Sequence, residues 1–147
     1  MSDMTRFTAT RSINAPIDLV FKTVSDINNF SKAIPDIINV EFLSDVKSGI
    51  GTRFRETRLM NGKEAMTELE VTEFVENDHV RTVTDSHGAI WDSVFTVKRV
   101  DGHTELTLVM DARPHKFMQK TMIPMIKGMI SKALEKDMDA VKTYCEK

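Results

Sequence analysis

Residues 114–147 read PHKFMQKTMIPMIKGMISKALEKDMDAVKTYCEK, and this methionine-rich stretch predicts the longest helix of the chain. Its apolar side chains recur at steps of three and four residues, which places them on one helical face. The stripe comprises Met118, Met122, Ile126, Met129 or Ile130, Ala133, Leu134, Val141 and Tyr144. We therefore expect a single amphipathic helix whose stripe packs on the rest of the chain.

Two residues interrupt this helical pattern. Pro124 has no backbone N–H to donate and clashes with the preceding turn. Gly128 costs roughly 1 kcal/mol relative to alanine inside a helix. We expect a kink near Pro124, and a gap in side-chain packing at Gly128 where the helix crosses the other elements.

The N-terminal part predicts one strand followed by two short helices. Thr5–Ile13 alternates and contains β-branched residues, which is typical of a strand. Pro16 and Asp18 are typical of the first turn of a helix, and Ser25-Asp26 can end that helix and cap a second one. Six further strands, separated by turn residues, are predicted at residues 37–43, 52–60, 65–75, 80–84, 90–97 and 104–110.

Strand alternation then assigns an inner and an outer face to this sheet. Asn61-Gly62 is a strong signal for a two-residue antiparallel hairpin. Trp91 and Phe95 share a face of one strand, and Leu108 lies on the matching face of the next. Apolar and polar residues alternate similarly elsewhere, so one face meets the long helix and the other contacts solvent. Residues 1–147 are thus expected to form one α+β domain with a seven-stranded antiparallel sheet, two short helices and one long C-terminal helix.

Composition excludes several functional classes. The net charge of −2 and pI near 6.1 provide no basic field for nucleic acid. Cys145 is the single cysteine, so no intramolecular disulfide is possible and a reducing cytoplasm is expected. No signal peptide is recognisable, and no window approaches the roughly 20 apolar residues that span a bilayer.

Four short segments and the final helix together resemble a known superfamily. They are Ser12–Phe21 (SINAPIDLVF), Ser25–Phe30 (SDINNF), Gly49–Phe54 (GIGTRF) and Val71–Phe74 (VTEF). Their order is similar to that of the SRPBCC superfamily, whose helix-grip fold includes START domains, birch-pollen-allergen-like proteins and polyketide cyclase/dehydrase-like proteins. Many relatives place a tryptophan near the end of the second short helix, where this chain has Phe30.

The resemblance implies a sheet curved around the last helix, with a deep apolar cavity between them. In relatives such cavities hold lipids, sterols, polyketides, hormones or quinones, and the fold includes carriers, sensors, cyclases and regulators. Because a fold does not fix a function, the function must be argued from the site. The residues expected to line the cavity are Phe54, Glu56, Arg58, Leu69, Val71, Arg81, Trp91, Phe95, Leu108, Met122, Met125, Ile126 and Met129.

The methionines and the charged residues in this set each allow two interpretations. Methionine suits an adaptable binding surface but also fills ordinary cores. Phe54, Glu56 and Arg58 share a strand face, so if Phe54 points into the cavity the charges follow, at a high cost unless they are paired. Alternatively, this strand lies near the sheet edge and its charges are solvated. Arg81 and Asp85 leave the same choice open, as does Asp92.

No motif selects a catalytic set, a metal site or a cofactor. The histidines lack zinc-site spacing, and Glu56, Asp85, Asp92 and His87 could act as acids or bases without any pattern choosing them. The first hypothesis is binding or carriage of a small hydrophobic molecule such as a lipid, quinone or polyketide. The alternative is a polyketide cyclase/dehydratase, and docking to a protein partner is a third. The sequence leaves the oligomeric state open.

Overall fold

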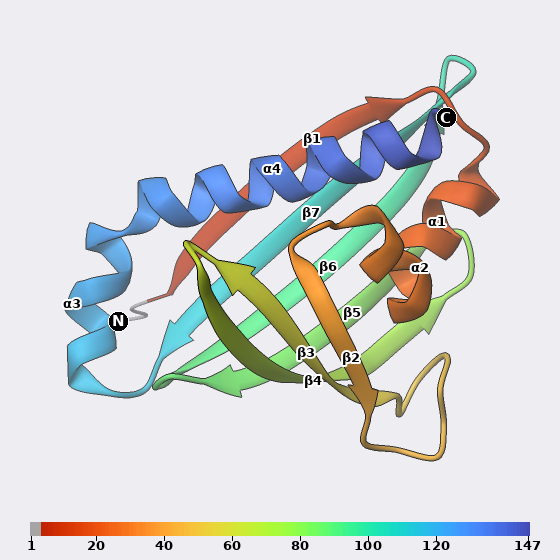
Figure 1. Ribbon diagram of the computed structural model, residues 1–147. Helices are drawn as coiled ribbons and strands as arrows, with labels where there is room; N and C mark the ends of the chain where they lie inside the picture. Colours follow the sequence, from red (N-terminus) through yellow and green to blue (C-terminus); the bar gives the residue numbers. More distant parts are fainter. Residues whose placement is uncertain (1–3) are drawn as a thin grey trace.

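A curved antiparallel sheet lies against one long helix in the computed structural model, which describes residues 4–147 (Figure 1). Met1–Asp3, the start of the span predicted as one domain, lie outside the described residues. The elements are β1 (Thr5–Ile13), α1 (Ile17–Ser25), α2 (Ile27–Ala33), β2 (Ile37–Phe42), β3 (Arg53–Met60), β4 (Lys63–Val75), β5 (His79–Ser86), β6 (Ala89–Val100), β7 (His103–Pro114), α3 (Phe117–Met125) and α4 (Lys127–Cys145). The predicted α+β helix-grip fold with seven strands is confirmed.

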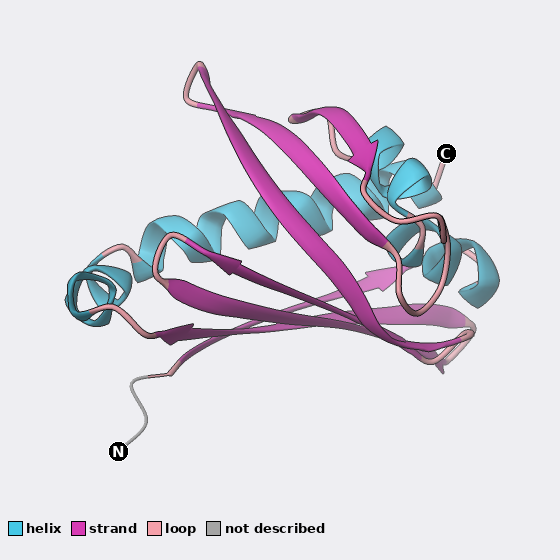
Figure 2. Ribbon diagram, turned by 90° about the horizontal axis from the view of Figure 1, so that it is seen from below, coloured by secondary structure: helices cyan, strands magenta, loops and turns pink. Residues whose placement is uncertain are grey.

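The strands follow the order β1-β7-β6-β5-β4-β3-β2, and every neighbouring pair is antiparallel. Register shifts occur between Ile37 and Asn39 in β2 and between Val71 and Glu73 in β4. Such irregularities bend a strand and increase its twist. Figure 2 shows β2, β3 and β4 rising out of the plane of the other strands, so the sheet is strongly curved.

Two-residue turns join several strands as the sequence predicts. Asn61 and Gly62 both have positive φ, 51° and 78°, as do His87 and Gly88, 53° and 82°. The carbonyl of Gly88 accepts hydrogen bonds from the backbone N–H groups of His115 and Lys116, at 2.9 and 3.1 Å. The β5–β6 turn therefore holds the chain just before α3.

The core lies where α4 crosses the inner face of the sheet. Leu134, Met138, Val141 and Cys145 form the buried face of α4. Burying a side chain of this size contributes about 1.5–3 kcal/mol. Arg11 of β1 pairs with Asp139 at 2.7 Å and also with Glu135, and Lys142 donates to the Ser12 carbonyl. Apolar burial and ion pairs thus fix the C-terminal half of α4 to the sheet.

The C-terminal region forms two helices, so the prediction of a single helix over Pro114–Lys147 is wrong. Pro124 lies inside α3 and cannot donate to the preceding turn. The break follows at Ile126, with φ −101° and ψ 14°, and α4 begins at Lys127. Figure 1 shows α3 turned sharply away from the axis of α4.

The N-terminal part of the predicted apolar stripe does not enter the core. Met118, Met122 and Met129 are exposed, whereas Leu134 and Val141 are buried. The expected packing gap between helix and sheet at Gly128 is also wrong, because Gly128 is exposed and does not line the cavity, and the open space around its Cα is solvent. Across residues 4–147, every helix is too short or too polar to cross a membrane.

Candidate functional site

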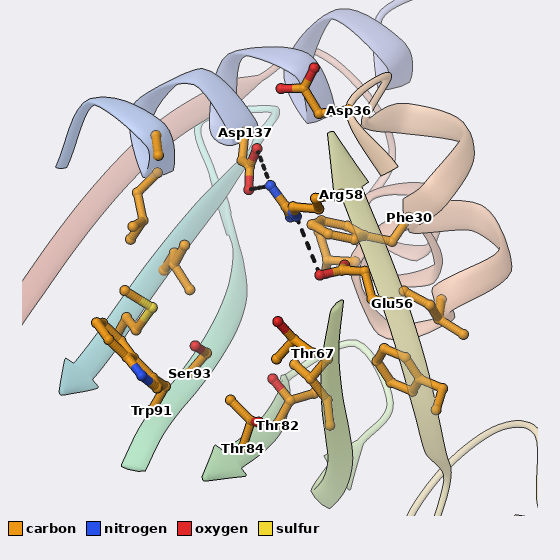
Figure 3. Close-up of a pocket in the computed structure, with 18 of the residues that line it drawn as sticks. Phe30, Asp36, Glu56, Arg58, Thr67, Thr82, Thr84, Trp91, Ser93 and Asp137 are labelled. Atoms are coloured by element: carbon orange, nitrogen blue, oxygen red, sulfur yellow. Dashed lines mark hydrogen bonds and ion pairs between the residues drawn. The ribbon is translucent and has the colours of Figure 1, made fainter. Parts of the chain in front are cut away.

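A cavity of about 810 Å³ lies between α4 and the inner face of the sheet. Strands β3 to β7 provide most of its floor, α1 and α2 close one end, and α4 covers it (Figures 1 and 3). A volume of this size falls within the range of small-molecule sites, which are mostly apolar with a few polar groups. The cavity thus has the dimensions and position for a small ligand.

Aromatic and aliphatic side chains make up the apolar part of the lining. Trp91 and Phe95 project from β6, and Leu108 projects from β7. Phe30 of α2 packs edge-on against Phe95, with ring centroids 5.8 Å apart. The indole N–H of Trp91 donates to the Ser86 carbonyl at 3.4 Å. This contact leaves the apolar ring of Trp91 facing the cavity, as Figure 3 shows.

Three charged residues form a polar cluster on the cavity wall. Alternation along β3 brings Glu56 and Arg58 to the inner face with Phe54, and α4 supplies Asp137. The Arg58 guanidinium donates to a Glu56 oxygen at 3.3 Å and lies 3.0 Å from an Asp137 oxygen (Figure 3). The solvated-edge interpretation of Glu56 and Arg58 is therefore wrong, and the alternative of paired inward charges holds.

Burial sets the protonation behaviour of this cluster. The side chains of Glu56, Arg58 and Asp137 are 12%, 22% and 18% exposed. Loss of solvation raises the pKa of Glu56, although Arg58 partly opposes that shift. Loss of solvation likewise raises the pKa of Asp137. Since one guanidinium faces two carboxylates, the cluster has an excess acidic group, which retains a proton to a higher pH than an exposed carboxyl does.

Hydroxyl groups line the floor opposite this cluster. Thr67 of β4, Thr82 and Thr84 of β5, and Ser93 of β6 face the cavity (Figure 3). Thr84 is 8% exposed, and its hydroxyl has no hydrogen-bond partner among the described residues. An unpaired buried hydroxyl costs free energy, and a polar group of a ligand can remove that cost.

The structure brings most of the predicted site residues to the cavity. Its lining includes nine of them: Phe54, Glu56, Arg58, Leu69, Val71, Trp91, Phe95, Leu108 and Met129. Arg81, Met122, Met125 and Ile126 do not line it, so their predicted place in the cavity is wrong. Met122 and Met125 lie on α3 and Ile126 lies at the break that follows it, and α3 is turned away from the axis of α4, which covers the cavity.

The sequence left undecided whether the charged residues of β5 and β6 face the cavity or solvent. Arg81, Asp85 and Asp92 lie on the outer face of the sheet. Arg81 donates to both oxygens of Asp92, at 2.8 and 2.7 Å. These hydrogen bonds lower the pKa of Asp92 despite its burial. Asp85 pairs with His115 at 2.8 Å, whereas His87 lies at the edge of the cavity. Of the four residues considered as acids or bases, the cavity therefore contains Glu56 and His87.

Asp137 is the site residue that the sequence interpretation missed. It lies three residues after Leu134 and four before Val141, so a carboxylate occupied the buried stripe of the helix. An acidic residue at a buried position of the helical pattern was the sequence signal that could have identified Asp137. The floor hydroxyls could have been found in the same way, because Thr82 and Thr84 alternate with the outward Arg81 and Asp85.

Within residues 4–147, no three His, Cys, Asp or Glu side chains converge as a metal site would require. Comparison with protein families gives a match over residues 4–146 to the family described as polyketide cyclase / dehydrase and lipid transport. The chain belongs to this family. The predicted resemblance to the SRPBCC superfamily and its polyketide cyclase/dehydrase-like branch is thereby confirmed. A search of curated proteins found no match.

Solved structures similar to this member of the family share its fold at low identity. A START superfamily protein from Mycobacterium smegmatis aligns with TM-score 0.78 and 18% identity, over 96% of this chain and 97% of its own. Ara h 8.0201 aligns with TM-score 0.77 and 14% identity, over 97% of each chain. The di-domain ARO/CYC StfQ from the steffimycin biosynthetic pathway gives TM-score 0.80 and 10% identity, over 97% of this chain and 51% of StfQ. At such identities the likeness extends to the fold alone.

Proposed function

We propose that the protein binds and carries a small hydrophobic molecule with an oxygen-containing polar group, held between α4 and the sheet. The single observation that supports this most is the combination of an 810 Å³ apolar cavity with the unpaired, buried hydroxyl of Thr84. The apolar body would contact Trp91, Phe95 and Leu108, and its polar group would accept or donate at Thr84 or the Arg58 cluster. A lipid, a quinone or a polyketide satisfies this description.

A cavity-filling variant tests this proposal. Ser93→Phe places a ring in the floor of the cavity, whereas Thr96→Phe places the same ring on the exposed outer side of the same strand. A thermal-shift screen with fatty acids, quinones and aromatic polyketides should raise the Tm of the native protein and of Thr96→Phe, but not of Ser93→Phe. If none of these ligands shifts the native protein, and native mass spectrometry finds none bound, the proposal is wrong.

Glu56 supports a second candidate, a cyclase or dehydratase for polyketide-like substrates. Glu56, like Asp137, is a largely buried carboxyl on the cavity wall, and burial raises its pKa, which favours the protonated form that can donate to a substrate carbonyl oxygen. A linear poly-β-keto thioester should then be converted to a cyclic product with loss of water. Glu56→Gln keeps the size and the hydrogen bond to Arg58 but removes the acid. This candidate requires turnover by the native protein and loss of at least about 100-fold in the variant.

A further inference from the structure

A group of large apolar side chains is exposed on α3 and the first turn of α4. The exposed fractions are 79% for Phe117, 72% for Met118, 39% for Met122, 83% for Met125 and 60% for Met129. Single exposed apolar residues are common, but a contiguous group usually marks an interaction site. We call these five residues the methionine surface.

The helical spacing shows how α3 presents this surface. Met118, Met122 and Met125 lie at positions i, i+4 and i+7, so they share one face of α3. Ile123, the one buried residue of α3, lies on another face and anchors the helix to the body. Figures 1 and 2 show α3 at one end of the molecule, beside the ends of the central strands. The apolar face of α3 is thus directed away from the core.

Positive charge accompanies the methionine surface. Residues 114–134 contain Lys116, Lys120, Lys127 and Lys132, all exposed, and no aspartate or glutamate. The rest of the chain contains 16 basic and 22 acidic residues, so its net charge is −6 against +4 for this segment. Two carboxylates that adjoin the segment have described partners, since Asp85 is paired with His115 and Glu135, which follows Leu134, is paired with Arg11. The segment that exposes the apolar side chains is therefore also the basic pole of an acidic protein.

We propose that α3 and the first turn of α4 dock on the surface of bilayers that contain anionic lipids. Exposed apolar side chains flanked by lysines are the features by which interfacial helices bind such surfaces, with the side chains entering the boundary of headgroups and acyl chains. A second copy of this chain is the less suitable occupant. A two-fold contact through this surface would bring two sets of four lysines together, and such like-charge contacts are unfavourable.

Docking would place the cavity opening next to the bilayer. Met129 is exposed and also lines the cavity, and Ile130 beside it lines the cavity as well. On the other rim, Met60 at the end of β3 is 51% exposed and lines the cavity too. An apolar molecule could thus pass between bilayer and cavity with little exposure to water. The docking itself requires no bound ligand, so its test is independent of the proposed function.

Cosedimentation with vesicles tests the docking. We expect the protein to bind vesicles of phosphatidylcholine with phosphatidylglycerol, to bind phosphatidylcholine alone much less, and to dissociate as salt rises from about 0.1 to 0.5 M. Lys116→Gln with Lys127→Gln should lower partitioning about 25-fold, roughly fivefold per lysine. The matched control, Lys22→Gln with Lys98→Gln, removes two exposed lysines elsewhere and should change partitioning little.

The apolar contribution has its own variants. Met118→Ser with Met125→Ser should lower binding at least tenfold, while Ile38→Ser with Val75→Ser, which removes apolar groups that are about half exposed elsewhere, should not. In a variant that combines Phe117→Trp with Trp91→Phe, the tryptophan at the methionine surface is the sole one. Brominated acyl chains should quench its fluorescence only when anionic lipid is present. All four serine positions are exposed, so circular dichroism should show each variant folded.

Three results would overturn the docking proposal. The first is absence of binding to anionic vesicles, and the second is equal binding by the methionine variant and its control. The third is sedimentation of the native protein as a dimer that Met118→Ser with Met125→Ser dissociates, which would assign the surface to a second copy. Saturable binding of an acidic soluble protein, together with absence of vesicle binding, would also contradict it.

Discussion

The two carboxylates around Arg58 define the chemistry of the cavity at the scale of single residues. Buried charges are tolerated where they are paired, and Arg58 is paired with both Glu56 and Asp137. Burial raises the pKa of both carboxyl groups, so protonation of either group stabilises the folded state. Asp92 and Asp111 on the outer face behave oppositely, since hydrogen bonds from arginines lower the pKa of each.

Glu56→Gln should therefore become more stable relative to the native protein as the pH rises. The folded pKa of Glu56 is raised above the ordinary value of 4.5, so its favourable contribution is complete below pH 4.5 and is lost as pH rises through the folded pKa. Urea unfolding at pH 4, 6 and 8 measures the difference in free energy of unfolding. Glu64→Gln, on an exposed strand end, controls for the loss of one negative charge. A difference that falls with increasing pH would contradict this assignment.

Thr84→Val should stabilise the protein without ligand by about 1 kcal/mol, because it removes a buried hydroxyl that has no partner. The matched control is Thr104→Val. The Thr104 hydroxyl is also buried but donates to the Ala15 carbonyl at 2.7 Å, so its loss should cost about 1 kcal/mol. Chemical denaturation of both variants gives the two values. Equal destabilisation would show that the Thr84 hydroxyl is satisfied in solution.

At the scale of elements, the break between α3 and α4 separates a fixed helix from an exposed one. Helical periodicity identified the C-terminal helix and its buried residues Leu134 and Val141. It could not predict the end of α3, because the same period continues through Met118 and Met122 whether or not a sheet lies beneath them. Pro124 was a correct signal for an irregularity, but its consequence, a new helix axis at Ile126, depends on tertiary contacts of the flanking residues.

Gly128→Ala should stabilise α4 by about 0.5–1 kcal/mol. Glycine is unfavourable inside a helix, and the added Cβ atom meets no neighbour within 4 Å. Thermal unfolding should show a higher Tm without loss of ligand binding, since Gly128 does not line the cavity. Gly62→Ala is the contrasting variant: its φ of +78° is unfavourable for alanine, and it should destabilise the protein. A destabilising Gly128→Ala would indicate an unrecognised contact at this position.

At the scale of the whole molecule, most of the architecture could be predicted from the sequence. Turn residues separated the seven strands, and alternation placed Trp91, Phe95 and Leu108 on the inner face. The inward direction of Glu56 and Arg58 was one of two open interpretations, because strand position in the sheet is not a local property. Asp137 contacts Arg58 across 79 residues of sequence, and a pairing of such range required the fold.

The central claim is that the cavity binds an apolar molecule with a polar group. Energy transfer from Trp91 to a bound fatty acid tests this claim most directly. Trp91 is the single tryptophan of the chain and lines the cavity, so excitation of Trp91 should produce emission from bound cis-parinaric acid. We predict saturable emission at one molecule per chain in the native protein and in Thr96→Phe, and at least tenfold weaker binding in Ser93→Phe. Trp91→Phe should abolish the transfer. Absence of saturable transfer in the native protein, or equal binding by folded Ser93→Phe, would contradict the account.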